Sequence, residues 1–128
     1  MSKFEFVGEY EFKASNKMLY TYLSTASGLA QWYADDVNIN PQKNLIIIWD
    51  GEENLAKIVS HRTNHEIKIE FIDEEDPDPS YVKFEILTSE MTSGNFLKVT
   101  DYSEIDDQEE LRELWDGLIH DLKEIVGG

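Results

Sequence analysis

The chain has 128 residues, of which 41% are hydrophobic and 12% are aromatic, enough apolar material for one hydrophobic core. Its 27 acidic and 11 basic residues give a formal net charge of −16. Binding to nucleic acid depends on lysine and arginine displacing counterions from phosphate. Because the sequence has no basic stripe, it excludes nucleic acid and anionic membrane surfaces as partners. The acidic excess favours solubility, or alternatively a patch for a basic partner.

The remaining composition indicates the compartment. No apolar run approaches the roughly 18 residues that a membrane span requires, and the N-terminal segment MSKFEFVGEY has no apolar core of a signal peptide. The absence of cysteine removes disulfides, thiolate metal sites and cysteine nucleophiles. We therefore predict one cytoplasmic domain over residues 1–128, with no membrane insertion.

The N-terminal segment predicts a strand followed by two short helices. Aromatic residues alternate with charged ones over residues 4–13, the period-two pattern of a half-buried strand. Gly8 is in phase with the aromatics, which indicates a bulge, a bend or a close approach of another element. The short helices are predicted in residues 15–23 and 25–33, with Ser15 or Asn16 and Thr25 or Ser27 as caps.

Residues 37–72 predict a series of strands. Val37 and Ile39 begin one strand, and the apolar run 45–49 ends in the hairpin signal Asp50-Gly51. Residues 54–62 and 66–72 predict two further strands joined by a turn near Thr63-Asn64.

An acidic loop separates these strands from the last two. In DEEDPDP, residues 73–79, like charges repel and proline removes backbone donors, so neither helix nor strand is expected. Residues 82–86 then alternate in the manner of a strand. After Ser93-Gly94, residues 96–102 predict the last strand.

Residues 106–128 predict one long helix. At 100° per residue its apolar side chains fall within one arc of about 140°, with Leu118 in the middle of that arc. Asp106 or Asp107 can cap the first turn, and Gly127 suits the other end. The apolar arc comprises Leu111, Leu114, Trp115, Leu118, Ile119, Leu122, Ile125 and Val126.

The order of these elements restricts the topology. Sequential strands joined by short turns form an antiparallel meander, and its apolar face must be covered. The two short helices cannot cover such a face alone. The C-terminal helix is therefore expected to lie across the sheet.

Three stretches resemble the START-like, helix-grip superfamily, especially its branch of heat-shock ATPase activator homologues. SGLAQWYADDV, residues 27–37, is similar to the branch's passage from helix to strand with an aromatic pair. LKVTDYSEID, residues 97–106, and ELWDGLIHDLKEIV, residues 113–126, are similar to its closing strand and gripping helix. Many members place glycine just before the helix tryptophan, whereas here Leu114 precedes Trp115 and the glycine is Gly117.

The resemblance implies an α+β helix-grip fold, in which a curved antiparallel sheet of about six or seven strands wraps around the C-terminal helix. Two short helices follow the first strand. Many relatives have an elongated apolar cavity between helix and sheet that accepts a lipid, a polyketide or another hydrophobic molecule. We expect Gly117 to leave space for such a cavity because it removes a side chain near the middle of the helix. Some relatives act instead on a chaperone, and a few are enzymes.

The sequence provides few residues for catalysis or metal binding. Its three histidines, His61, His65 and His120, lack the spacing of zinc motifs, and no P-loop, G-x-S-x-G or G-x-G-x-x-G occurs. The acidic run 73–78 lacks the ligand spacing and central glycine of a calcium loop. We predict no catalytic, metal-binding or cofactor-binding residues.

The aromatic residues are the remaining functional signal, and they serve either as ordinary core or as the lining of a cavity. A ligand pocket is mostly apolar with a few polar groups that fix orientation. We predict a ligand-binding set of inward-facing Trp32, Trp49, Phe71, Phe84, Trp115 and Leu118, with Arg62, Tyr81 and Tyr102 as polar candidates.

Three functions agree with this sequence. The first is non-enzymatic binding of a small hydrophobic molecule such as a lipid or polyketide. The second is a protein-interaction module, acting on a chaperone or another partner, with a filled interior. An apolar cavity of some 300 Å³ or more would favour the first. The third, a cyclase or hydratase, requires a buried polar cluster of Arg62, His61 and Tyr102.

Overall fold

The computed structural model describes residues 2–88 and 94–128 and has a seven-stranded sheet and three helices in this part of the chain. Of the predicted Ser93-Gly94 turn, Ser93 lies outside the described residues. The elements in chain order are β1 (Phe4–Phe12), α1 (Asn16–Ser24), α2 (Ala26–Leu29), β2 (Asp36–Ile39), β3 (Leu45–Trp49), β4 (Glu52–Arg62), β5 (Glu66–Phe71), β6 (Tyr81–Thr88), β7 (Asn95–Ser103) and α3 (Gln108–Val126).

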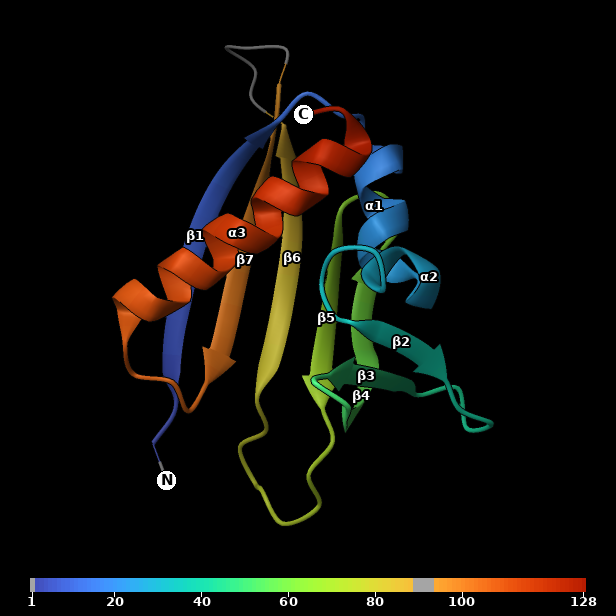
Figure 1. Cartoon of the computed structure of the whole chain (residues 1–128), viewed down its shortest axis with the longest axis vertical. Helices are drawn as coiled ribbons and strands as arrows, with labels where there is room; N and C mark the ends of the chain where they lie inside the picture. Colours follow the sequence, from blue (N-terminus) through green and yellow to red (C-terminus); the bar gives the residue numbers. More distant parts are fainter. Residues whose placement is uncertain (1, 89–93) are drawn as a thin grey trace.

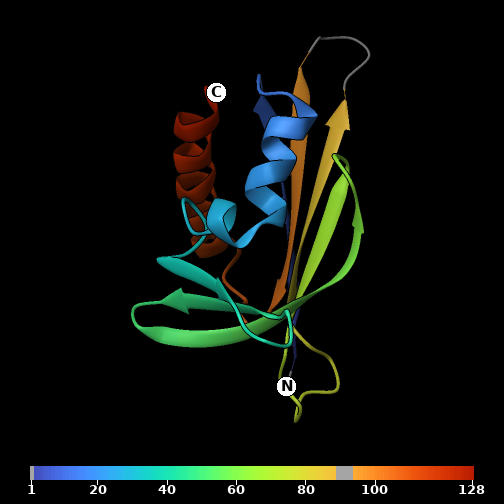
Figure 2. The ribbon, with the colours of Figure 1, turned by 90° about the vertical axis from the view of Figure 1, so that its right-hand side faces the viewer.

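The strands form one antiparallel sheet in the order β1-β7-β6-β5-β4-β3-β2. Strands β2 to β7 follow one another as a meander, and β1 is added beside β7. Figure 2 shows the curvature: β2, β3 and part of β4 run across the end of the sheet, away from the direction of β6 and β7. All three helices lie on the concave side (Figures 1 and 2). The predicted α+β helix-grip fold is confirmed.

Helix α3 crosses the concave face with well-defined ends. The Asp107 side chain accepts hydrogen bonds from the backbone N–H groups of Glu109 and Glu110, both at 3.1 Å, and caps the helix. At the other end Gly127 adopts a left-handed conformation with φ of 87°, which glycine does without steric cost.

Only part of the predicted apolar arc of α3 is buried. Leu111, Trp115, Ile119 and Leu122 form the buried line, each at most 1% exposed. Leu114 is 49% exposed, and Leu118 is half-buried. The arc is therefore wider than the surface that grips the sheet, and Leu118 lies at the edge of that surface.

Gly8 in β1 marks a close approach of side chains. The pairing of β1 with β7 continues in register from Phe4 to Phe12, without a bulge. A Cβ atom at Gly8 would lie 3.0 Å from the Tyr10 side chain and 3.2 Å from that of Phe6. Glycine thus allows the aromatic residues on either side to close over the strand. The Tyr10 hydroxyl donates a hydrogen bond to Asp116 of α3 at 3.0 Å, which links β1 to the helix.

The two short helices position an aromatic pair over the sheet. Ser15 caps α1 and Thr25 caps α2 through their hydroxyl oxygens. Gly28 is buried where the helices meet, and a Cβ atom there would lie 2.5 Å from the backbone oxygen of Thr21. The chain then turns into Trp32, whose indole N–H donates to the backbone oxygen of Tyr22 at 2.8 Å.

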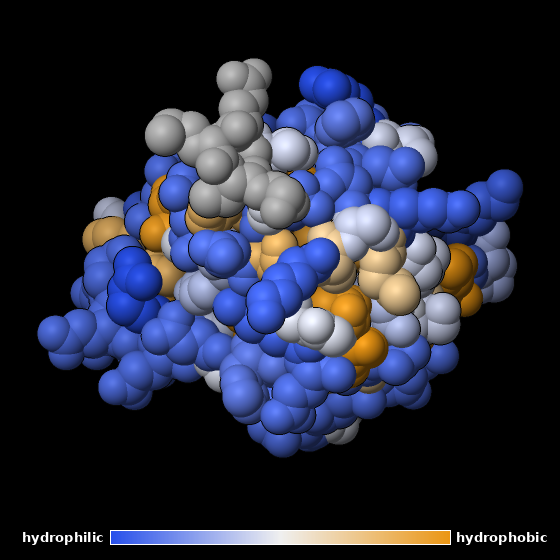
Figure 3. Space-filling model, turned by 90° about the horizontal axis from the view of Figure 1, so that it is seen from above, coloured by the Kyte–Doolittle hydropathy of each residue, from blue (hydrophilic) through white to orange (hydrophobic). Residues whose placement is uncertain are grey.

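The outer surface reflects the acidic composition. Figure 3 views the end where α3 terminates, and hydrophilic residues cover most of it, with hydrophobic residues in small areas between them. In the described part of the chain, none of the helices combines the length and the hydrophobicity needed to cross a membrane.

Candidate ligand-binding cleft

A cleft of about 730 Å³ lies between α3 and the end of the sheet where β2 and β3 cross it. We call it the aromatic cleft. Its walls come from the segment after α2, the β3–β4 hairpin, the end of β5, the start of β6, the end of β7 and the middle of α3. A straight helix cannot follow a strongly curved sheet along its whole length. The space therefore opens where the curvature is greatest.

The inner wall of the aromatic cleft is a cluster of rings around Tyr33. The Tyr33 ring stacks on Trp115, with centroids 6.0 Å apart and planes inclined by 25°. It meets Trp49 edge-on at 5.3 Å, and Trp49 in turn lies 6.1 Å from Phe71. These residues come from the α2–β2 segment, β3, β5 and α3, so the wall exists only in the folded chain.

Hydrogen bonds fix the tryptophans of this wall. The Trp49 indole N–H donates to the backbone oxygen of Tyr33 at 3.0 Å. The Trp115 indole N–H donates to the Asp101 carboxylate at 2.8 Å. A ring held by both packing and a hydrogen bond keeps its orientation. The wall is therefore largely preformed for a ligand.

Asp101 is the half-buried acid of the aromatic cleft. Strand alternation turns it inward with Leu97 and Val99, which are fully buried. Burial raises the pKa of the Asp101 carboxyl above its usual range, and hydrogen bonds from Trp115 and Ser103 oppose this shift. The ionised Asp101 carboxylate is thus partly desolvated, although one of its oxygens accepts a hydrogen bond from the Trp115 indole.

Tyr33 brings a hydroxyl group to the inner wall of the cleft. Only 5% of this residue is exposed, and burial, together with the nearby negative charge of Asp101, raises the pKa of its hydroxyl above the usual range. No group in the described residues accepts a hydrogen bond from this hydroxyl. Among the described residues no fully enclosed side-chain oxygen or nitrogen lacks a hydrogen-bond partner, so this hydroxyl still reaches the space of the cleft. A bound molecule could supply its partner there.

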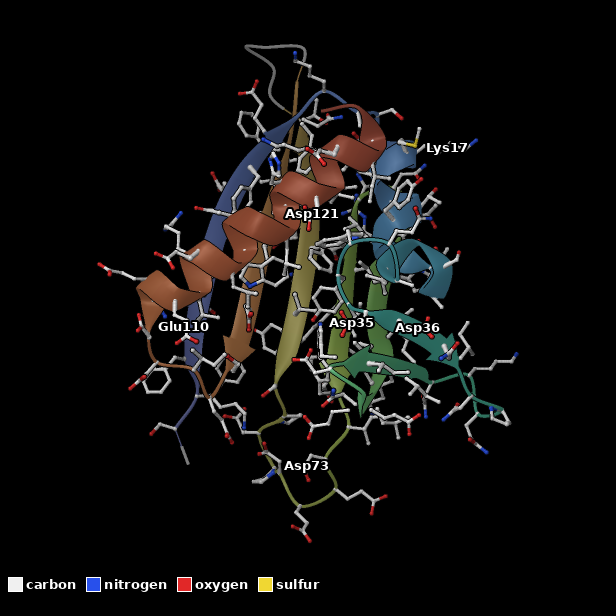
Figure 4. The ribbon with its side chains drawn as sticks, in the orientation of Figure 1. Lys17, Asp35, Asp36, Asp73, Glu110 and Asp121 are labelled. Carbon is white, nitrogen blue, oxygen red and sulfur yellow. The ribbon has the colours of Figure 1, made fainter. Side chains whose placement is uncertain are left out.

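The charged groups around the aromatic cleft are all acidic. Among the described lining residues there are four aspartates and no lysine, arginine or histidine. Asp35 also accepts a hydrogen bond from the backbone N–H of Asp50 at 2.7 Å, which ties the entry to β2 to the β3–β4 turn. Figure 4 shows Asp121 on α3 and Asp35 below it, near the start of β2. The lining aspartates are Asp35, Asp50, Asp101 and Asp121.

The structure brings most of the predicted apolar set together. Trp32, Trp49, Phe71, Trp115 and Leu118 all line the aromatic cleft. The remaining member, Phe84, is fully buried behind them, in edge contact with Trp115 at 5.9 Å. That these side chains contact a ligand stays a prediction.

Tyr81 and Tyr102 border the cleft, but their rings lie on the outer face of the sheet. Each alternates with an inward residue, Val82 and Asp101 respectively, and the two rings stack with centroids 5.1 Å apart. The Tyr102 hydroxyl donates to Asp78 of the acidic loop at 2.6 Å. These groups support the loop rather than orient a molecule on the concave face.

Arg62 lies elsewhere, at the far end of β4. It is exposed, and the strand register aligns it with Lys98 through Glu66 and Glu85, whereas Tyr102 lies further along β7 toward the aromatic cleft. His61 is also exposed. The polar cluster that a cyclase or hydratase would need is therefore not assembled.

The other candidate groups also lie apart from the cleft. Exposed His120 contacts Glu124 at 3.2 Å. Within residues 2–88 and 94–128, no three His, Cys, Asp or Glu side chains are grouped closely enough to hold a metal ion. Gly117 is exposed on α3 and does not line the aromatic cleft, so the expectation that it opens the cavity is wrong.

Sequence reasoning missed Tyr33 and Asp101. Tyr33 is the second member of the aromatic pair in SGLAQWYADDV, of which only Trp32 was selected. Asp101 alternates in step with Leu97 and Val99, which face the core. A charged residue at such a position could have been predicted to belong to a functional site.

Comparisons with known proteins give the family. The model of the START-like superfamily domain matches residues 1–128. A solution structure of protein BfR322 from Bacteroides fragilis is 32% identical, with 98% of this chain and 92% of that chain covered and a TM-score of 0.64. No curated protein matches the chain.

Two more distant structures share the fold. The Aha1 dimer from Colwellia psychrerythraea is 16% identical, with 96% of each chain covered and a TM-score of 0.76. A START superfamily protein from Mycobacterium smegmatis is 13% identical, with 96% of this chain and 97% of that chain covered and a TM-score of 0.68. The START-like superfamily predicted from the sequence is confirmed, and both structures share the fold of this chain.

Proposed function

The chain belongs to the START-like superfamily, and we propose that it binds a small hydrophobic molecule in the aromatic cleft without converting it. Hydrophobic ligands are common in this superfamily. The observation that carries the proposal is the cleft of about 730 Å³ behind α3. Its volume falls within the roughly 300–1,000 Å³ typical of small-molecule sites.

The wall of the cleft supports this assignment. A core built only for stability closes its voids, because each void loses dispersion contacts and hydrophobic stabilisation. Here Trp49, Phe71 and Leu118 are only half-buried, although they lie on the concave side of the fold. An apolar ligand would remove these side chains from water.

Thermal shift and tryptophan fluorescence with a neutral apolar probe, dodecanol, test the proposal. Ligand binding raises stability by RT ln(1 + [L]/Kd), about 2.7 kcal/mol at a hundredfold excess over Kd. Because Trp49 and Trp115 line the cleft, their emission should change as well. Native mass spectrometry of protein purified from its source would show whether a molecule is retained.

A filling variant provides the control. Leu118→Trp should occupy the cleft and abolish the thermal shift while the protein stays folded. Glu113→Trp adds the same side chain to an exposed position of α3 outside the lining and should leave the shift intact. Binding that survives Leu118→Trp would place the probe elsewhere and overturn the assignment.

A second candidate function is a protein-interaction module, favoured by the net charge of −16 and by the fold shared with Aha1. In that case the aromatic cleft would receive a side chain of a basic partner. The absence of any thermal shift with apolar probes, combined with salt-sensitive binding to a basic protein, would favour this second function.

A further inference from the structure

The chemistry of the aromatic cleft restricts the charge of its ligand. The four lining aspartates are not balanced by any cationic side chain among the described lining residues. A fatty acid or another anion would bring its own negative charge next to Asp101, which is already partly desolvated. Anionic ligands are therefore disfavoured, although they are apolar enough for the wall.

Tyr33 and Asp101 leave room for a positively charged partner. Asp101 receives the Trp115 indole N–H on one carboxylate oxygen, Oδ2, and the Ser103 hydroxyl also stabilises the carboxylate. Tyr33 is 5% exposed; its hydroxyl lacks a protein acceptor in the described part of the chain, and its oxygen can itself accept a hydrogen bond. An ammonium group, which only donates hydrogen bonds, would complement both groups at once.

The rings add a second attraction for the same kind of group. The faces of tryptophan and tyrosine carry negative electrostatic potential and attract cations, most strongly where water is excluded. Tyr33, Trp49 and Trp115 come together at centroid distances of 5.3 and 6.0 Å from the Tyr33 ring. Several rings beside a carboxylate form the arrangement that recognises amines and quaternary ammonium groups.

Building on the proposed function, we infer that the ligand of the aromatic cleft is an apolar molecule bearing a cationic amine or ammonium group. The cationic group lies at Asp101 and the Tyr33 hydroxyl. The apolar part lies against Trp49, Phe71 and Leu118. Asp35, Asp50 and Asp121 raise the local concentration of cations at the rim.

Three probes with the same twelve-carbon chain test the inference: dodecylamine, dodecanol and dodecanoate, each below its micelle concentration at neutral pH. Titration followed by tryptophan emission gives the three dissociation constants. We expect dodecylamine to bind at least about tenfold more tightly than dodecanol, and dodecanoate to bind most weakly. A dodecanoate affinity equal to or above that of dodecylamine would overturn the inference.

Because the whole protein carries a charge of −16, matched variants must separate the cleft from the general field. The double variant Asp101→Asn with Asp121→Asn removes two charges from the cleft, and asparagine at 101 can still accept the Trp115 hydrogen bond. It should lower the preference for amine over alcohol to within about threefold. Glu9→Gln with Glu11→Gln removes two charges from exposed positions of β1 and should leave the preference unchanged.

A single variant tests whether the Tyr33 hydroxyl contributes to amine binding. Tyr33→Phe retains the ring and should weaken dodecylamine several-fold more than dodecanol. Thermal melts of each variant without ligand establish that it is folded.

The outcomes separate this inference from the proposed function. If dodecanol binds in the cleft but dodecylamine binds no better, the ligand class is wrong and the binding function survives. Equal loss of preference in the β1 control would show that only the overall charge attracts the amine, and would also overturn the inference. If none of the three probes binds, the proposed function fails and the inference fails with it.

Discussion

Two neighbouring lines of side chains on α3 have opposite environments. The gripping line, Leu111, Trp115, Ile119 and Leu122, is at most 1% exposed. The cleft line, Leu114, Leu118 and Asp121, lines the aromatic cleft, and none of its members is buried. A single helix thus serves both as the core of the fold and as the wall of a site. The hydrophobic pattern of α3 alone does not show which of its residues pack in the core and which line the cleft.

The sheet causes the difference. Over β1 and β7 the sheet follows α3 closely, and Gly8 permits a tight layer of aromatic side chains there. Toward β2 and β3 the sheet bends across to the side on which α3 lies, below the helix in Figure 2, and Tyr33 stacks on Trp115 between them. The environment of each position on α3 is therefore set by strands distant in sequence.

The largest expected effect comes from a charge in the gripping line. Ile119→Asp places a carboxylate at a position that is 1% exposed, and we expect a loss of at least about 4 kcal/mol in the free energy of unfolding. The matched change Leu118→Asp falls in the half-buried cleft line and should cost only about 1–2 kcal/mol. Urea denaturation of both variants measures the difference. Equal losses would show that the two lines are not distinct.

A smaller loss is expected where α1 meets α2. Gly28→Ala would bring a Cβ atom within 2.5 Å of the Thr21 backbone oxygen, and because a backbone atom cannot move aside cheaply, we expect about 1–3 kcal/mol of destabilisation. Trp32 and Tyr33 follow this junction directly, so the variant should also change the tryptophan emission spectrum. A variant with unchanged stability and emission would contradict the view that this contact positions the aromatic pair.

The sequence was sufficient to predict the elements and their order. Period-two alternation located the strands, the 100° periodicity located α3, and short connections predicted an antiparallel sheet. These are local properties, and each is determined by the residues of one element and its turns. The inward placement of Trp49 and Phe71 followed from the same alternation.

The candidate site was less predictable. Because Tyr81 alternates with the inward-facing Val82, the sequence pattern was enough to place Tyr81 on the outer face of the sheet. It was nevertheless predicted to contact a ligand because tyrosine is polar. Arg62 could not be placed because the register of β4 shifts between Ile58 and Ser60, which breaks the period beyond that point. The depth of Leu118 depends on the curvature of the sheet, which no local pattern specifies.

A modest gain in stability is expected at Gly117. This residue is exposed in the middle of α3, and an added Cβ atom would meet no atom within 4 Å. Gly117→Ala should therefore raise the free energy of unfolding by about 1 kcal/mol through helix propensity alone. It should leave probe binding in the aromatic cleft unchanged. Weaker binding of dodecanol by this variant would show that Gly117 contributes to the site after all.

The smallest effect is expected at Asp101, and it depends on pH. Burial raises the folded-state pKa of this carboxyl above its unfolded value of about 3.8, because the charged form is partly desolvated. The native state then holds the proton more strongly than the unfolded state, so stability falls as pH rises between the two pKa values. Above the folded-state pKa the full cost of the ionised carboxylate is present, and below the unfolded pKa it is absent.

The variant Asp101→Asn removes this cost and keeps an acceptor for the Trp115 indole. We expect its melting temperature to exceed that of the unchanged protein at neutral pH, and the difference to shrink as the pH falls toward 3.8. Glu9→Gln, on the exposed side of β1, should show no such trend. If Asp101→Asn is instead less stable at neutral pH, the hydrogen bond from Trp115 outweighs desolvation. Asp101 would then stabilise the fold as the partner of Trp115, and a cationic ligand would not be needed to offset its burial.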